Sequence, residues 1–357
     1  MGGRSAKQPY GALDKTSQLD YRAYFKAKGS TAVLQAFLLS GDELATGANQ
    51  LAIVTRTGID VYRLQSSRLV RQIKVEIVLA TSGVQRGKDA LTYVRSDNLV
   101  QVAVPALSLP RDIDFTDKVT ALRFVGENSL LVGFATGAVS IASTNDLVVS
   151  HVEIGEIRLP VGMFAYTQTQ TQVYAMAGYR SEQQSSLYLL PLPDTPEQYV
   201  GVFESLPGTC ADATVGENEK LVLALCEETG SVYIWDLENH NYLLSLDLST
   251  QTLSKIIAFE DTNIDGEITL VLGGTEGLTV GRLRILDGQI TWTPRSKSQV
   301  QDSKKVKSAA VTSLHWDKPL EMLIMGDAEG QVWLIRGLSS QSNALKQANT
   351  AQAQEIN

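Results

Sequence analysis

A hairpin pattern that recurs along the chain restricts what this sequence can fold into. In each copy an apolar extended run leads through a small or polar pair and a glycine into a second extended run, which is typical of two antiparallel strands. Glycine suits such turns because it adopts positive φ without a Cβ clash. A lone hairpin is only marginally stable in water, so the copies must pack on one another. The copies are Leu51–Leu64, Leu130–Ser143, Leu221–Leu237, Leu270–Leu286 and Met322–Ile335, with turn glycines Gly58, Gly137, Gly230, Gly277 and Gly330.

The spacing of the turn glycines indicates a repeat. The gaps are about 79, 93, 47 and 53 residues, and the first two are each about twice a period of roughly 40–45. A four-stranded propeller blade has this period. The sequence therefore predicts an all-β fold, a seven-bladed β-propeller, with a degenerate copy inside each long gap.

The stretch Gly230–Leu237, GSVYIWDL, resembles the repeat motif of the WD-repeat β-propeller family. The resemblance extends from Ala32 to Leu338. It departs from the family in that no Gly-His dipeptide occurs, and the Trp-Asp position is Arg63-Leu64 in the first hairpin and Ile335-Arg336 in the last. It implies a closed, WD-repeat-like ring that docks other proteins.

Three segments are expected along the chain. Residues 1–30 form an arm, in which Asp20–Phe25 either closes the ring by pairing with the last blade or belongs to a disordered leader. Residues 31–338 form the propeller. Residues 339–357 form a polar tail with little to bury. The blade count depends most on blade two, from Ile77 to Leu109, where the pattern is weakest.

Charge and composition narrow the class of protein. The formal net charge is −8, which argues against nucleic-acid binding by bulk charge. Two cysteines, Cys210 and Cys226, are too few for a disulfide framework and are expected to fill the core. No apolar run approaches the ~20 residues of a membrane-spanning helix, and no signal peptide is visible. We expect a cytoplasmic or nuclear protein.

No catalytic motif stands out in the sequence. The three histidines, His151, His240 and His315, lie in different predicted blades and lack metal-ligand neighbours at suitable spacing. We therefore expect no enzyme, no catalytic residue and no cofactor. A hydrolase or lyase with its site at the mouth of the channel remains the alternative.

Two polar segments are weaker candidates for ligand sites. Asp261, Asn263 and Asp265 match the first half of a calcium loop, but Leu272 stands where the bidentate Glu should be, which favours a simple polar turn. A basic linker could contact RNA or phospholipid, although a solvated loop is the plainer interpretation because no aromatic residues interleave to stack on bases. Its cations are Arg295, Lys297, Lys304, Lys305 and Lys307.

A propeller without catalytic residues offers loops held in fixed geometry. We expect a non-catalytic scaffold within a multiprotein complex, with partners on the loops of one face, the top face. The candidate residues are Gly126, Glu127, Asn128, the segment Gly216–Glu219 with Glu217, Asn218 and Glu219, and Lys318 with Pro319. A narrower resemblance, to the small propeller nucleoporins of the Y-shaped nuclear pore complex, rests on Val119–Ser143 and Val311–Ser340.

Overall fold

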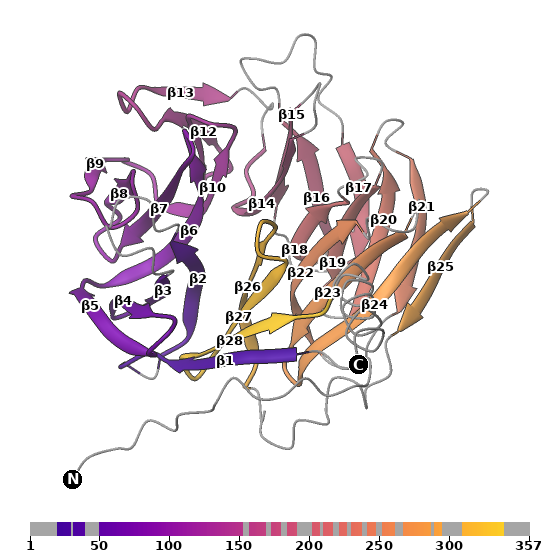
Figure 1. Cartoon of the computed structure of the whole chain (residues 1–357). Coiled ribbons are helices and arrows are strands. Elements are labelled where there is room, and N and C mark those ends of the chain that lie inside the picture. The colour runs from indigo at the N-terminus through magenta and orange to yellow at the C-terminus, as the bar shows by residue number, and fades with distance from the viewer. Residues whose placement is uncertain are drawn as a thin grey trace, which may run out of the picture.

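In the computed structural model the chain forms seven antiparallel sheets of four strands each, arranged as a β-propeller (Figure 1). The prediction of a seven-bladed, all-β propeller is confirmed. No helix occurs in the part of the chain that the structure describes. That part comprises residues 20–29, 31–39, 50–152, 157–168, 173–179, 184–190, 202–207, 210–216, 221–226, 230–237, 241–247, 252–260, 267–286, 289–294 and 309–338.

Each blade is a meander in which strands adjacent in the sequence pair in order. The first three blades are β2 (Val33–Leu39), β3 (Gln50–Thr55), β4 (Gly58–Arg63) and β5 (Arg68–Lys74); β6 (Ile77–Gln85), β7 (Lys88–Arg95), β8 (Val100–Ala103) and β9 (Arg111–Ile113); β10 (Val119–Val125), β11 (Ser129–Phe134), β12 (Val139–Ser143) and β13 (Val149–Val152).

Blades four to six continue in the same way, and blade seven takes its fourth strand from the start of the chain. They are β14 (Val161–Gln168), β15 (Val173–Tyr179), β16 (Gln184–Leu189) and β17 (Val202–Pro207); β18 (Cys210–Val215), β19 (Leu221–Cys226), β20 (Ser231–Asp236) and β21 (Tyr242–Asp247); β22 (Leu253–Glu260), β23 (Glu267–Gly274), β24 (Gly277–Leu286) and β25 (Gln289–Pro294); β26 (Val311–Asp317), β27 (Met322–Asp327), β28 (Gln331–Arg336) and β1 (Asp20–Lys26).

The core is divided into apolar clusters that lie between blades. Each of the seven pairs of neighbouring blades shares one cluster. The cluster between blades five and six, for example, joins Leu223 and Ile234 to Leu270 and Leu283, all fully buried. A single blade cannot bury both faces alone, so the stacking of neighbours stabilises every sheet.

The innermost strand of every blade begins with the same irregularity. Its register with the second strand shifts between its first and third residues, as in Val119/Ala121 of blade three. Such a bulge increases local twist and re-aims the side chains that follow. The first residues are apolar and at most 5% exposed: Val33, Ile77, Val119, Val161, Cys210, Leu253 and Val311.

Three glycines on second strands allow the next blade to approach closely. A Cβ added at Gly133 would lie 2.6 Å from Val161 Cγ1, and one at Gly273 would lie 2.6 Å from Val311 Cγ1. Gly326 repeats the arrangement, with Val33 Cγ1 at 2.5 Å from the added Cβ. Each valine is the first residue of the next inner strand, so glycine and valine together set the distance between blades.

The start of the chain closes the ring. β1 pairs antiparallel with β28, and of the two alternatives for Asp20–Phe25 the structure has the strand. The side chain of Phe25 is 3% exposed and packs between blades seven and one, with its ring centroid 5.7 Å from that of Tyr62. Tyr62 Oη of blade one donates to the carbonyl of Lys26 at 2.8 Å. The closing strand is therefore tied to both blades that it joins.

The turn glycines of the repeat occupy matching places. Gly58, Gly137, Gly230, Gly277 and Gly330 all have positive φ, between 66° and 147°, and all lie where the second strand of a blade turns into the third. In blade two this turn contains Asn98, at φ 71°, in place of glycine. Asparagine tolerates the left-handed region better than most residues do. The turn of blade two therefore needs no glycine, and a search for turn glycines does not find it.

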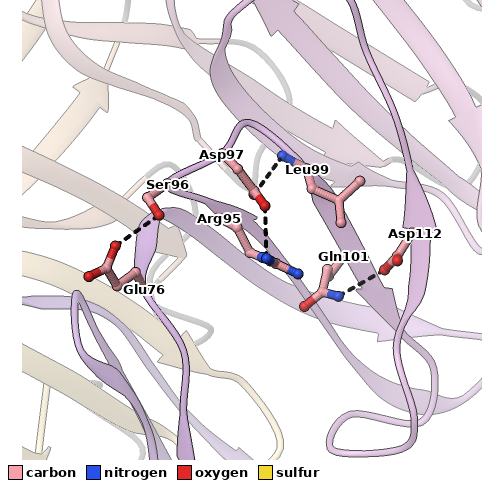
Figure 2. A network of polar contacts seen from close by, with 7 residues as sticks. All are labelled: Glu76, Arg95, Ser96, Asp97, Leu99, Gln101 and Asp112. Carbon is pink, nitrogen blue, oxygen red and sulfur yellow. Dashed lines mark hydrogen bonds and ion pairs between the residues drawn. The ribbon is translucent and has the colours of Figure 1, made fainter.

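Blade two is pinned by polar contacts around the same turn (Figure 2). Arg95 Nη2 lies 2.7 Å from Asp97 Oδ2, and Ser96 Oγ donates to Glu76 Oε2 at 2.9 Å. Its outer strand β9 lies beyond Leu109, where the sequence placed the end of the blade.

Candidate protein-interaction surface

Turns between the first and second strands of the blades share one side of the ring, because all first strands run in the same direction. We call this side the top face. It carries the β10–β11 turn with Gly126–Asn128 and the β26–β27 turn with Lys318 and Pro319. In the β18–β19 turn, Gly216 N donates to Leu221 O at 2.9 Å, while Glu217, Asn218 and Glu219 lie outside the described residues.

The β10–β11 turn is tied to the neighbouring blades through Gly126. Gln85 Nε2 of blade two donates to Gly126 O at 3.0 Å. Gly126 N donates to Tyr166 Oη of blade four at 2.8 Å. Gln85 is fully buried and also accepts from Thr144 Oγ1 at 3.1 Å. Both backbone polar groups of this glycine are therefore satisfied by other blades.

Asn128, at the other end of the turn, is also fixed by hydrogen bonds. Its Oδ1 accepts from Arg86 Nε at 2.8 Å and from Asn145 Nδ2 at 3.2 Å. Its backbone carbonyl accepts from Thr144 N at 2.7 Å. Glu127 between them is exposed. The turn thus exposes the carboxylate of Glu127 on a backbone that contacts from three blades hold in place.

The supporting residues Gln85, Arg86, Asn145 and Tyr166 escaped the sequence analysis. Gln85 and Arg86 lie in the corresponding turn of blade two, about 40 residues before Gly126. No local pattern marks a side chain that bonds across blades. The repeat period is the signal that could have placed the two turns side by side.

The second described turn is shaped by Asp317. Its Oδ1 accepts from Leu320 N at 3.0 Å, and Glu321 N donates to Lys318 O at 3.2 Å. Burial raises the pKa of Asp317, and the hydrogen bond from Leu320 opposes that shift. Lys318 and Pro319 are exposed at the tip.

Three titratable side chains on inner strands influence one another electrostatically. Arg123 on β10, Asp212 on β18 and His315 on β26 come from blades three, five and seven. Desolvation by the surrounding inner strands lowers the pKa of Arg123, although its side chain is exposed, and Asp212 opposes this shift. Burial, with a smaller contribution from Arg123, lowers the pKa of His315 to about 4, so this histidine is neutral at pH 7.

Several sequence candidates fall outside the described residues. These are the calcium-loop residues Asp261, Asn263 and Asp265, and the basic linker with Arg295, Lys297, Lys304, Lys305 and Lys307. Among the residues that are described, no group of three or more His, Cys, Asp or Glu side chains is placed to hold a metal ion. The buried Cys210 donates from Sγ to Asp212 O at 3.6 Å.

Comparison with models of known protein families and with curated protein sequences gives no match for this chain. The evidence for the propeller architecture is therefore the seven sheets themselves. The likeness to WD-repeat proteins is limited to the sequence motif Gly230–Leu237. The described residues contain no helix long and apolar enough to cross a membrane.

Proposed function

We propose that this protein is a non-catalytic interaction scaffold, a subunit of a larger multiprotein assembly, that binds partner proteins through its top face. The observation that carries the proposal is the β10–β11 turn, where hydrogen bonds from blades two, three and four hold Gly126 and Asn128. A loop that is already ordered loses little conformational entropy on binding, and this favours affinity.

The exposed groups on this face suit polar recognition. Glu127 and Lys318 stand at the tips of two described turns and are exposed. Rim charges of this kind direct partner choice and association rate more than they add affinity. A β-propeller commonly serves as a protein-interaction scaffold, and its many fixed loops explain why.

Affinity isolation from cells of the native organism, with mass spectrometry, tests the proposal. Glu127→Lys and Lys318→Glu should each lose partners that the wild-type chain retains. Asp114→Lys and Lys118→Glu are matched controls, since both residues are exposed on connections at the opposite side of the ring. Identical partner sets for all four variants and the wild type would contradict the proposal.

Two alternatives accompany this proposal, a nucleoporin-type role and the binding of RNA or phospholipid. A nucleoporin-type structural role is supported by the likeness of Val119–Ser143 and Val311–Ser340 to the small propeller nucleoporins, and recovery of nuclear pore subunits would establish it. RNA or phospholipid binding through residues 295–307 predicts salt-dependent affinity for RNA or anionic vesicles. The absence of catalysis and a cytoplasmic or nuclear location are parts of the proposal too.

A further inference from the structure

A groove of about 290 Å³ opens between blades one and two. One wall comes from β4, β5 and Val75, and the other from β7, β8 and the loop 104–110 that leads to β9. Ile59 and Ile73 face Leu91 and Tyr93 across it. At about 30 Å³ for each water molecule, the space holds about ten waters, enough for a large apolar side chain.

A bulge in β5 shapes the first wall. Leu69 pairs with Tyr62 and Arg71 with Val61, so Val70 is the extra residue between them. Leu69 packs in the cluster between blades seven and one, whereas Ile73 packs in the cluster between blades one and two. The bulge therefore turns Arg71 and Ile73 together into the groove.

Arg71 is fixed at the rim of the groove. Its Nη1 donates to Leu107 O at 2.9 Å. It is the one charged residue among the described residues that line the groove. A guanidinium has five N–H donors, so this contact leaves it able to bind a carboxylate as well.

The opposite rim is an ordered loop with a sparsely populated backbone conformation. Leu107 has φ 70° although it is not glycine. Ala106 N donates to Asp89 O at 2.6 Å, and Ser108 N donates to Pro105 O at 3.0 Å. Such a conformation persists where the surroundings enforce it, and it gathers at binding sites.

Large apolar side chains are exposed at the groove and next to it. Leu109, which lines the groove, is 92% exposed, and Val70, which precedes Arg71 in β5, is 49% exposed. Neighbouring apolar side chains left open to water, next to an apolar groove with a polar rim, are typical of a recognition surface.

The charge on β5 defines the partner. Arg68, Arg71 and Lys74 are exposed and β5 contains no acidic residue, in a chain of net charge −8. Gln101 on the other wall donates from Nε2 to Asp112, which lies outside the lining, at 2.8 Å (Figure 2). Among the described strands β5 is the outer strand of its sheet, so an extended segment can also pair with its edge.

We propose that this groove binds an extended segment of a partner protein that carries a large apolar side chain flanked by aspartate or glutamate. The apolar side chain fills the space between Ile73 and Leu91, and a flanking carboxylate pairs with Arg71. The groove lies between blades one and two, whereas Glu127 and Lys318 belong to turns of blades three and seven. It depends on the proposed function only in that its occupant is a protein.

Fluorescence anisotropy with labelled synthetic peptides tests the site on the full chain. The probe is Ser-Glu-Asp-Leu-Phe-Asp-Glu-Ser. One comparison peptide replaces the four acidic residues by lysine, and another replaces Leu-Phe by Ala-Ala. The acidic apolar peptide should bind at least about tenfold more tightly than either comparison peptide. Failure of the wild-type chain to bind it at concentrations up to about 1 mM overturns the proposal.

Matched variants assign the binding to this groove. Arg71→Glu should weaken binding of the acidic peptide at least about tenfold and improve binding of the lysine peptide, whereas Arg63→Glu on the neighbouring strand should change neither. Leu109→Ser should weaken binding, with Val148→Ser as the control because Val148 is also exposed, at 60%. Equal effects of Arg71→Glu and Arg63→Glu would overturn the assignment.

A second copy of the chain is the competing occupant. Light scattering should show that the wild-type chain is a monomer. A wild-type dimer that Leu109→Ser dissociates would overturn the proposal. Failure of the peptide experiment leaves the top-face partner test unaffected, so the two proposals can fail independently.

Discussion

Asn98 of blade two accepts a hydrogen bond from the backbone N–H of Val119 in blade three, at 2.9 Å from its Oδ1. Its Nδ2 donates to Phe115 O at 3.2 Å and to Asp117 O at 2.9 Å. One amide therefore satisfies three backbone groups of the connection that leads into the first strand of blade three. The residue that replaces the turn glycine also aligns the next blade.

Replacing Asn98 should destabilise the fold. Asn98→Ala removes the acceptor and both donors and leaves a Cβ at positive φ, so we expect a loss of about 1–3 kcal/mol in the free energy of unfolding, measured in urea. Asn98→Asp keeps the acceptor for Val119 N but loses the donors and should fall between alanine and wild type. Equal stability of Asn98→Ala and wild type would show that the connection needs no such clamp.

Gly326→Ala should push blades seven and one apart. The new Cβ would lie 2.5 Å from Val33 Cγ1 and 2.6 Å from Ser313 Oγ, so the blades must shift. We expect a loss of about 1–3 kcal/mol, measured by denaturant unfolding. The double variant Gly326→Ala with Val33→Ala should lose less than the sum of the single changes. Strict additivity would contradict the proposed close contact.

Phe25→Ala should weaken the closure of the ring. This buried ring packs between two blades, so its loss should cost about 3–5 kcal/mol in the free energy of unfolding. Tyr62→Phe, which removes the hydrogen bond to Lys26 O, should cost only about 1 kcal/mol. Calorimetry can compare the two. A change in Phe25→Ala no larger than that in Tyr62→Phe would mean that β1 is a minor part of the ring.

His315 should make stability fall on acidification. Its folded-state pKa is about 4, below the usual 6.5, so the unfolded chain binds the proton more readily. Stability present at neutral pH is therefore lost as the pH falls from 6.5 toward 4, and His315→Gln should show a shallower decline in denaturant titrations. Asp317 and Asp327, whose raised pKa values act in the opposite direction, are shared by both proteins and cancel in the difference. Parallel profiles would contradict the lowered pKa of His315.

Tyr166→Phe should loosen the β10–β11 turn. The change removes the acceptor of Gly126 N, so the amide of Gly126 should exchange its hydrogen at least about tenfold faster. The loss of global stability should be about 1 kcal/mol. Amide exchange read by NMR distinguishes the local effect, with Gly137, whose N–H donates to Phe134 O within its own turn, as the internal reference. Unchanged exchange at Gly126 would show that the turn is held without this contact.

The sequence alone determined the hairpins, their period and the all-β ring, because alternation and turn glycines act between residues close in the chain. It also offered Asp20–Phe25 as a strand that could close the ring, but could not choose between that strand and a disordered leader. The choice depends on an edge more than 300 residues away, on β28.

Only the tertiary structure decided how the blades meet and what they present. The clamp on Gly126 needs side chains from blades two and four, and the groove beside Arg71 needs a bulge at Val70 together with a loop of the next blade. The same holds for Gly133, Gly273 and Gly326, which look like ordinary strand residues until a valine of the next blade lies against them. Contacts between blades depend on distance and direction in space, and local sequence patterns record neither.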